Sequence, residues 1–317
     1  MQKTLIDFTT LTADYDVPNA DTKENKATLV NYSSQAGARF TDEEKELMVT
    51  SLSLNNWRVE LASSSRTVER MKDSMTKEAT TTSNARQFDG EDMASKTILG
   101  IRILFPESAF NSYAIIKPPF EIQAYQDKEE LQADGSLVVA DEEKGRGTKF
   151  DGFGVIKNVG VIKEIECMAY GANYPHALEV ILMDENYTER SYHLDYLNYE
   201  GWKRLTWTNP NYISEVRNRE IQMYPLYPRS VPYRKLIGFV IYRDAASIGG
   251  DFITYLKEVK ITYDEAIREQ DELQIDDESI WGILQTRNEA RQLAEYKRLG
   301  NRQVLELLEK MKMHEEQ

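Results

Sequence analysis

Alternation of apolar and polar positions runs through the middle of the chain and predicts short β-strands. Ile101, Ile103 and Phe105 share one face of such a strand, and residues 258–263 alternate in the same way. Period two is typical of strands with one buried and one wet face. Further strands are predicted at 27–32, 57–62, 113–117, 120–125, 161–170, 177–183, 191–197, 204–208, 236–242 and 252–257. Turn formers such as Pro118-Pro119 and Gly249-Gly250 separate them, so we expect a mainly β fold, an antiparallel β-sandwich of jelly-roll type similar to carbohydrate-binding modules.

The N-terminal 95 residues are less regular. Residues 41–51 form a charged helical pattern, and Thr41 followed three positions later by Glu44 fits a capping box. The Ser- and Thr-rich run 63–83 predicts a long loop, and the Gly-rich run 145–154 a flexible hairpin or interstrand loop. We expect the early strands at 27–32 and 57–62 to join the same sandwich.

The pattern changes after Tyr263. Residues 264–278 hold eight acidic residues and one Arg, and helical periodicity follows over 279–299 and 301–314, with a break expected at Gly300-Asn301. The predicted organisation is a β-sandwich domain at 1–263 and an acidic linker with a C-terminal α-helical arm at 264–317. The apolar stripe of that arm either packs on the sandwich or contacts a neighbouring subunit.

Charge and hydropathy narrow the possible partners. The formal net charge is −14, which repels nucleic-acid phosphates and anionic lipid surfaces. No apolar run approaches the roughly 20 residues of a membrane-spanning helix, so we expect neither nucleic-acid binding nor membrane insertion. Residues 1–30 contain no signal-peptide core, so the protein either stays in the cytosol or has lost its signal. The single cysteine, Cys167, is expected on a strand facing the core.

Catalytic motifs are sparse. His176, His193 and His314 are far apart in the sequence, the glycines at 145–154 match no phosphate-binding pattern, and no serine-nucleophile elbow occurs. Carboxylates are abundant, but no pair stands out, so a sandwich glycosidase is only a third hypothesis. We therefore predict a protein that is not an enzyme, with no catalytic residue, no cofactor and no metal site.

An aromatic and proline-rich region at 192–233 is the most unusual feature of the composition. Exposed aromatic side chains stack on sugars or anchor protein interfaces, whereas those on strands more often fill the core. With the apolar residues of the arm, they are the candidate assembly or glycan contacts: Tyr199, Trp202, Tyr212, Tyr224, Tyr227, Tyr233, Trp281 and Leu284.

Several short segments carry a resemblance to a known family. They are NWRVELASSSRTV at 56–68, SMTKE at 74–78, LIDF at 5–8, FTDEEK at 40–45, LGIRI at 99–103 and GDFITYL at 250–256. In this order they resemble the spirochaete periplasmic flagellar filament outer-layer (sheath) family, FlaA. The similarity covers residues 5 to about 263, and the helical end is the least distinctive part.

The resemblance implies a function that the motifs alone do not. Members are exported through a cleavable signal and form a sheath around the flagellin core in the periplasm, where they influence filament stiffness, curvature and motility. The implied partners are core flagellin subunits, other sheath proteins and further copies of the chain. The signal, absent before Met1, is expected to have been removed. The alternative is a periplasmic carbohydrate-binding module-like protein, with Trp202, Trp207, Tyr212 or Tyr224 stacking on sugar rings.

Overall fold

The computed structural model describes residues 1–11, 28–35, 37, 39–83, 87–88, 92–126, 145–212, 231–266 and 281–315, together with the backbone of 129–131 and 137–139; within the C-terminal helix, only the backbone of 298–304 and 314–315 is described. The chain divides into two compact units. One comprises Met1–Gln126 and Gly145–Ile267, and the other Asp127–Lys144 and Arg268–Gln317. The predicted division at residue 263 stays a prediction.

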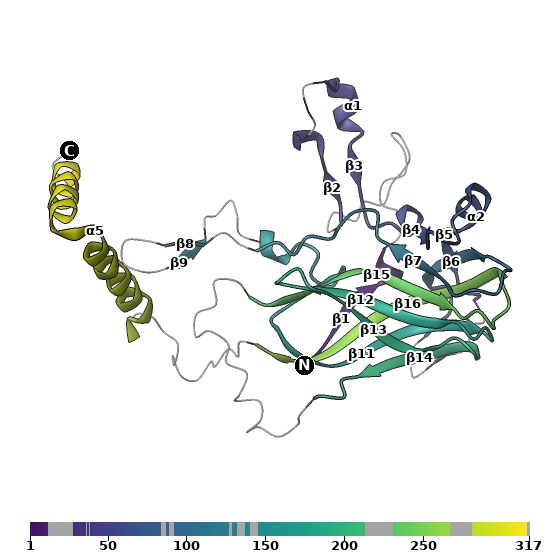
Figure 1. The fold of residues 1–317 in the computed structure, drawn as a ribbon. Coiled ribbons are helices and arrows are strands. Elements are labelled where there is room, and N and C mark those ends of the chain that lie inside the picture. The colour runs from purple at the N-terminus through teal and green to yellow at the C-terminus, as the bar shows by residue number, and fades with distance from the viewer. Residues whose placement is uncertain are drawn as a thin grey trace. The chain divides into compact units, whose positions relative to one another are not determined.

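In the described residues of the first unit, two six-stranded antiparallel sheets form a sandwich (Figure 1). The first sheet has the order β14 (Glu200–Thr208), β11 (Val159–Ala172), β16 (Gly250–Glu265), β6 (Thr97–Phe105) and β5 (Met75–Thr80), with β1 (Gln2–Asp7) also paired to β16. The second has the order β13 (Glu189–Tyr196), β12 (Ala177–Asp184), β15 (Tyr233–Arg243), β7 (Ser112–Lys117) and β4 (Arg58–Leu61), with β10 (Val155–Lys157) also paired to β15. The mainly β, antiparallel sandwich prediction is confirmed.

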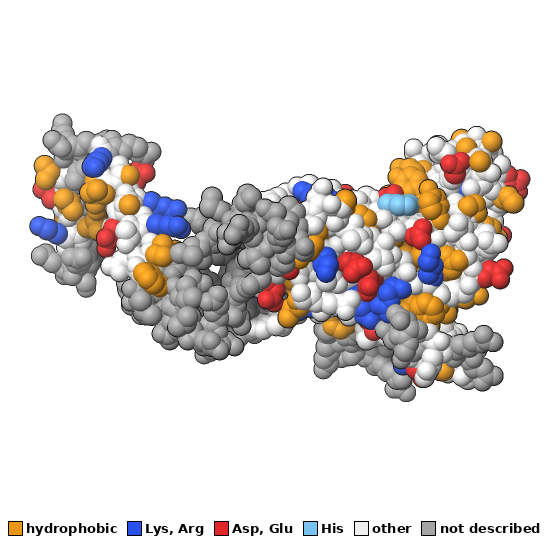
Figure 2. Space-filling model, turned by 90° about the horizontal axis from the view of Figure 1, so that it is seen from below, with side chains coloured by type: hydrophobic (Ala, Val, Ile, Leu, Met, Phe, Trp, Pro, Cys, Tyr) orange, Lys and Arg blue, Asp and Glu red, His pale blue; other side chains and the backbone are white. Residues whose placement is uncertain are grey.

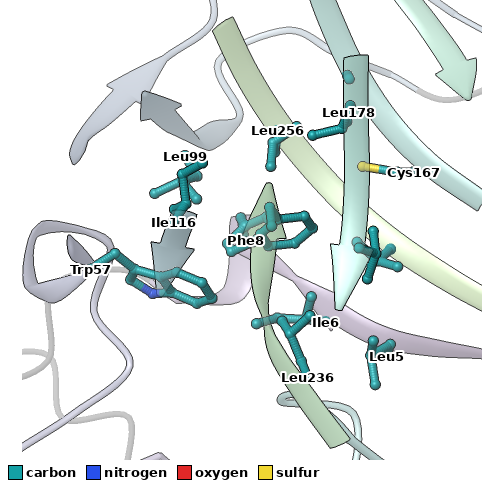
Figure 3. Packing of buried hydrophobic residues seen from close by; sticks show 14 of the residues in the cluster. Leu5, Ile6, Phe8, Trp57, Leu99, Ile116, Cys167, Leu178, Leu236 and Leu256 are labelled. Atoms are coloured by element: carbon teal, nitrogen blue, oxygen red, sulfur yellow. The ribbon is translucent and has the colours of Figure 1, made fainter. Parts of the chain in front are cut away.

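The core lies between the two sheets because each strand turns its apolar face inward. Ile101, Ile103 and Phe105 are buried as their alternation predicts, and Cys167 on β11 is fully buried. Figure 3 shows the Phe8 ring in the middle of the cluster beside Trp57, and the two ring centroids are 5.3 Å apart in an edge-on arrangement. Burial of such aromatic area supplies much of the driving force for the fold.

The predicted helix at 41–51 is shorter in the structure. Its capping box is confirmed: Thr41 N donates to Glu44 Oε2 at 2.8 Å, and Glu44 N donates to Thr41 Oγ1 at 3.2 Å. The helix α1 (Asp42–Glu46) is followed by β3 (Val49–Thr50), which pairs with β2 (Val30–Asn31). This β2–β3 ribbon projects from the sandwich (Figure 1), so the prediction that 27–32 joins the sandwich is wrong.

The predicted loop at 63–83 is wrong, because α2 (Val68–Asp73) and β5 lie within it. The hydroxyl groups that suggested a loop are used locally. Thr67 Oγ1 accepts a hydrogen bond from Arg70 N at 3.2 Å and caps α2, and Thr76 Oγ1 donates to Trp57 O at 2.8 Å below β5. A dense Ser/Thr composition therefore does not exclude regular structure when the hydroxyls satisfy backbone groups.

Other strand predictions differ in detail. The predicted strand 120–125 forms no strand in the described chain, although Ile122 is fully buried. Pro118-Pro119 removes backbone donors just before it, so burial there is achieved without a ladder. The run 145–154 is an interstrand loop that contains a 3-10 turn, η4 (Arg146–Thr148), and buries Phe150. The other 3-10 turns are η1 (Phe8–Thr10), η2 (Ser33–Gln35) and η3 (Leu54–Asn56).

The second unit contains the hairpin β8 (Glu129–Leu131)–β9 (Leu137–Val139) and the helix α5 (Ile283–Glu315). Tyr296 Oη donates to Met311 Sδ at 3.9 Å, whereas the 15 residues between them would span about 22 Å in a straight helix. The helix is therefore sharply bent, as Figure 1 shows. The helix continues through Gly300 and Asn301, so the prediction of two helical segments with a break there is wrong: the chain bends in this stretch without leaving the helix.

Candidate assembly surfaces

Three tyrosines lie in register on the outer face of the second sheet. Tyr113 on β7 pairs with Tyr242 on β15. On the other side of β15, Tyr242 pairs with Ala177 on β12, and Ala177 pairs with Tyr196 on β13. The first two ring centroids are 5.3 Å apart. We name Tyr113, Tyr242 and Tyr196 the tyrosine row; their exposed fractions are 37%, 41% and 48%. Ala177, the small residue that separates Tyr242 from Tyr196 in this register, is 9% exposed.

Polar side chains border the tyrosine row on the same face. Ser191 Oγ donates to Glu179 Oε2, and His193 Nδ1 lies 3.7 Å from Glu179 Oε1. The His193 ring also meets Tyr196 edge-on, with centroids 5.4 Å apart. An aromatic centre beside charged residues is the usual anatomy of a protein interface.

The first sheet carries a second aromatic group on its outer face. Trp202, Tyr170 and Tyr255 pair across β14, β11 and β16, and Tyr170 meets both neighbours edge-on at 5.5 Å and 5.7 Å. We name these three residues the aromatic ladder. Gly100 on β6 leaves room for Tyr255, since a Cβ there would lie 3.3 Å from the tyrosine ring. All three rings are half-buried, so they offer less free surface than the tyrosine row.

The structure places the other predicted contact residues in different settings. Tyr199 packs against the core, and its hydroxyl donates to Ala169 O at 3.1 Å; burial raises its pKa. Tyr212 Oη donates to Asp264 Oδ2 at 2.9 Å. Both rings therefore have local structural partners.

The remaining predicted residues are spread over both units. Tyr233, at the start of β15, is half-buried, and burial raises its pKa. Trp281 is 60% exposed just before α5, and Leu284 is half-buried within it. Tyr224 and Tyr227 lie outside the described residues. None of the eight sits in the tyrosine row, and their role as contacts stays a prediction.

The sequence patterns did not predict the tyrosine row, although two of its three residues stand out in the sequence. Tyr113 and Tyr242 occupy outward positions of the predicted strands 113–117 and 236–242, where a polar residue is expected. Their alignment depends on which strands pair. In Figure 2, hydrophobic side chains form separate patches among charged ones on the visible face of the molecule.

Metal and membrane chemistry find no support in the described chain. No group of three His, Cys, Asp or Glu side chains is placed there to hold a metal ion. No helix among the described residues is long and apolar enough to cross a membrane. Burial raises the pKa of the Cys167 thiol, so it is not a poised nucleophile.

These observations define an antiparallel β-sandwich protein with aromatic rows on its outer faces and a bent helical segment. The family model for the flagellar filament outer layer protein FlaA matches residues 21–271, and the chain belongs to that family. It is 44% identical over 315 residues to the flagellar filament outer layer protein of Spirochaeta aurantia, covering 99% of this chain and 88% of that one. The protein of the same name from Treponema pallidum is 40% identical, covering 98% of this chain and 89% of its own.

Among solved structures, carbohydrate-binding modules of the β-sandwich superfamily match 67% of this chain and 58% of their own, at 9% identity and a TM-score of 0.30. The family 11 carbohydrate-binding module of a Clostridium thermocellum cellulase matches 68% of this chain and 91% of its own, at 7% identity and a TM-score of 0.26. Similarity this low carries no argument about a ligand.

Proposed function

We propose that this chain is a structural subunit of the outer layer of the spirochaete periplasmic flagellar filament. The observation that carries the proposal is sequence similarity over nearly the whole chain to two proteins named for that layer. In this function the protein is not an enzyme: it coats the flagellin core in the periplasm, after removal of an export signal, and influences filament stiffness and curvature.

The tyrosine row is the surface we assign to contact with the filament. Tyrosine is enriched among interface residues that dominate binding energy, because a large rigid side chain desolvates at low entropy cost. The row places three such side chains in one line on a rigid sheet, and its polar border supplies orientation. One patch of this size binds weakly, but many copies on a filament add avidity.

The helical arm is the second contact we assign, here to a neighbouring copy. The α5 sequence carries seven Lys or Arg and five Glu, whereas the whole chain has a net charge of −14. A basic helix is complementary to the acidic remainder of another copy, which favours association and fixes its orientation. Trp281, exposed beside the helix, is a suitable anchor for this contact.

The test is co-sedimentation of the purified protein with filaments from which the outer layer has been stripped. We expect the wild type to sediment with them and Tyr113→Ser/Tyr242→Ser to bind at least tenfold more weakly, because loss of one buried aromatic contact costs roughly 1–2 kcal/mol and 1.4 kcal/mol is tenfold. Tyr187→Ser is the matched control, since this tyrosine is 73% exposed but lies outside the row.

Two outcomes would count against the proposal. A folded wild-type protein that stays in the supernatant contradicts the outer-layer function itself. If Tyr113→Ser/Tyr242→Ser binds normally, or if Tyr187→Ser weakens binding as much as the double variant does, the tyrosine row is not the contact. The arm is then tested by Trp281→Ser.

A further inference from the structure

A cavity of about 630 Å³ opens where the edge strands of the two sheets, β14 and β13, meet. Its walls come from both sheets: Trp207 lies on β14, Tyr192 and Arg190 on β13, and Asp184 at the end of β12. This volume falls within the roughly 300–1,000 Å³ typical of small-molecule sites. The cavity lies entirely in the first unit and is separate from both the tyrosine row and the aromatic ladder.

Two aromatic side chains form the apolar wall. Tyr192 and Trp207 meet edge-on, with ring centroids 4.7 Å apart and an angle of 70° between the rings. Both pack partly against the core, which fixes their positions, and both remain partly accessible. Within the described chain, neither the Tyr192 hydroxyl nor the Trp207 indole N–H has a hydrogen-bond partner. Burial raises the pKa of Tyr192, so its hydroxyl remains a donor at neutral pH.

Asp184 supplies an acceptor on the floor of the cavity. The residue is 8% exposed, and its Oδ1 accepts from the backbone N–H groups of Asn186 at 3.0 Å and Thr188 at 2.9 Å. Those bonds hold the carboxylate in place as part of the β12–β13 turn. Its Oδ2 has no partner among the described residues and is left for a ligand.

Two arginines also line the cavity. Arg190 is exposed on the rim and forms no ion pair with a described residue. Arg234 also lines the cavity, but its guanidinium donates to Glu185 Oε2 at 2.6 Å, which neutralises it. The cavity thus combines free donors, a fixed acceptor and a rigid aromatic wall.

We propose that this cavity binds an uncharged saccharide. A sugar presents C–H faces that pack on aromatic rings, and its hydroxyl groups both donate and accept, so they suit the Asp184 carboxylate and the Arg190 guanidinium together. An anionic ligand is opposed by Asp184 and by the net charge of −14. A cationic ligand is opposed by Arg190. The site is additional to the outer-layer function and does not depend on it.

The experiment uses the full chain and saturation-transfer NMR, followed by calorimetry for every ligand that responds. The probes are cellotriose, xylotriose, mannotriose and β-1,4-galactotriose, with trigalacturonate as the charged counterpart. We expect at least one neutral trisaccharide to bind. Trp207→Phe should weaken it at least fivefold by shrinking the stacking surface. Asp184→Asn should weaken it at least tenfold, because the turn acceptor Oδ1 is kept while Oδ2 becomes an amide donor.

Trp202→Phe is the matched control, because it makes the same substitution on the aromatic ladder. Each variant must show the same cooperative urea transition as the wild type before its affinity is compared. The proposal is overturned if no neutral probe binds, if trigalacturonate alone binds, or if Trp202→Phe weakens binding while Trp207→Phe and Asp184→Asn leave it unchanged. None of these results bears on co-sedimentation with filaments, so the saccharide site and the outer-layer function are tested independently.

Discussion

Replacement of the buried histidine should change how the stability of the protein depends on pH. His176 is 1% exposed and is surrounded by aromatic rings, with centroids 5.2 Å from Phe105, 5.6 Å from Tyr174 and 4.7 Å from Phe252. Burial lowers its pKa to about 4; a hydrogen bond to the backbone opposes the shift, and the nearby Arg243 guanidinium adds to it.

The sign and size of the effect follow from proton linkage. The folded-state pKa lies below the unfolded value of about 6.5, so between the two the unfolded chain binds more protons. Stability is therefore retained above pH 6.5 and lost as the pH falls towards 4. Each pKa unit is worth about 1.4 kcal/mol, so His176 alone should cost about 2 kcal/mol of the free energy of unfolding between pH 7 and pH 5.

The measurement is urea unfolding of wild type and His176→Phe at pH 7, 6 and 5, monitored by tryptophan fluorescence. Carboxylate titrations are common to both proteins and cancel in the difference. We expect the wild type to lose about 2 kcal/mol relative to the variant as the pH falls from 7 to 5. His193→Gln, a substitution on an exposed strand position, is the control. A difference that stays constant with pH would refute the reasoning, whatever the absolute stability of His176→Phe.

Three further predictions concern packing. Arg243 is buried and donates to three backbone carbonyls of the 106–110 segment. Arg243→Ala leaves these acceptors unpaired and should lower the free energy of unfolding, measured in urea titrations, by about 3 kcal/mol. An unchanged urea midpoint would contradict this role of Arg243. Gly171→Ala would place a Cβ 2.5 Å from the carbonyl oxygen of Tyr199. The clash should lower the free energy of unfolding by roughly 1–3 kcal/mol, and differential scanning calorimetry should show a lower melting temperature. An unchanged melting temperature would mean that the backbone moves without cost. Cys167 is fully buried with a raised pKa, so the native protein should resist iodoacetamide at pH 8 and react after unfolding; rapid native alkylation, followed by mass spectrometry, would contradict its burial.

Local patterns predicted the parts of the fold that depend on neighbouring residues. The alternation at 101–105 gave the inward face of β6, and the Thr41–Glu44 spacing gave the cap of α1. Local patterns predicted the wrong structure where strand pairing or a side-chain hydrogen bond to the backbone decided the conformation. The helix predicted at 41–51 ends early because the chain continues into β3, which pairs with β2. In the run 63–83, hydroxyl groups cap α2 and bond to the backbone beside β5.

The candidate surfaces were much less accessible to sequence reasoning. Aromatic enrichment drew attention to 192–233, but the structure places Tyr199 against the core and gives Tyr212 a local partner. Residue type alone does not distinguish an aromatic side chain that fills the core from one that is exposed at a binding surface, because both depend on the same rigid apolar ring.

The sequence by itself determined the β-sandwich class, the inward face of its clearest strands, the helical character of the C-terminal end and the family resemblance. Only the tertiary structure decided that Tyr113, Tyr242 and Tyr196 form one row and that Tyr192, Trp207 and Asp184 line one cavity. The physical reason is that period two fixes which face a side chain occupies, whereas its neighbours across the sheet depend on strand pairing and register. Those are set by hydrogen bonds and packing between segments more than 100 residues apart, such as β7 and β15.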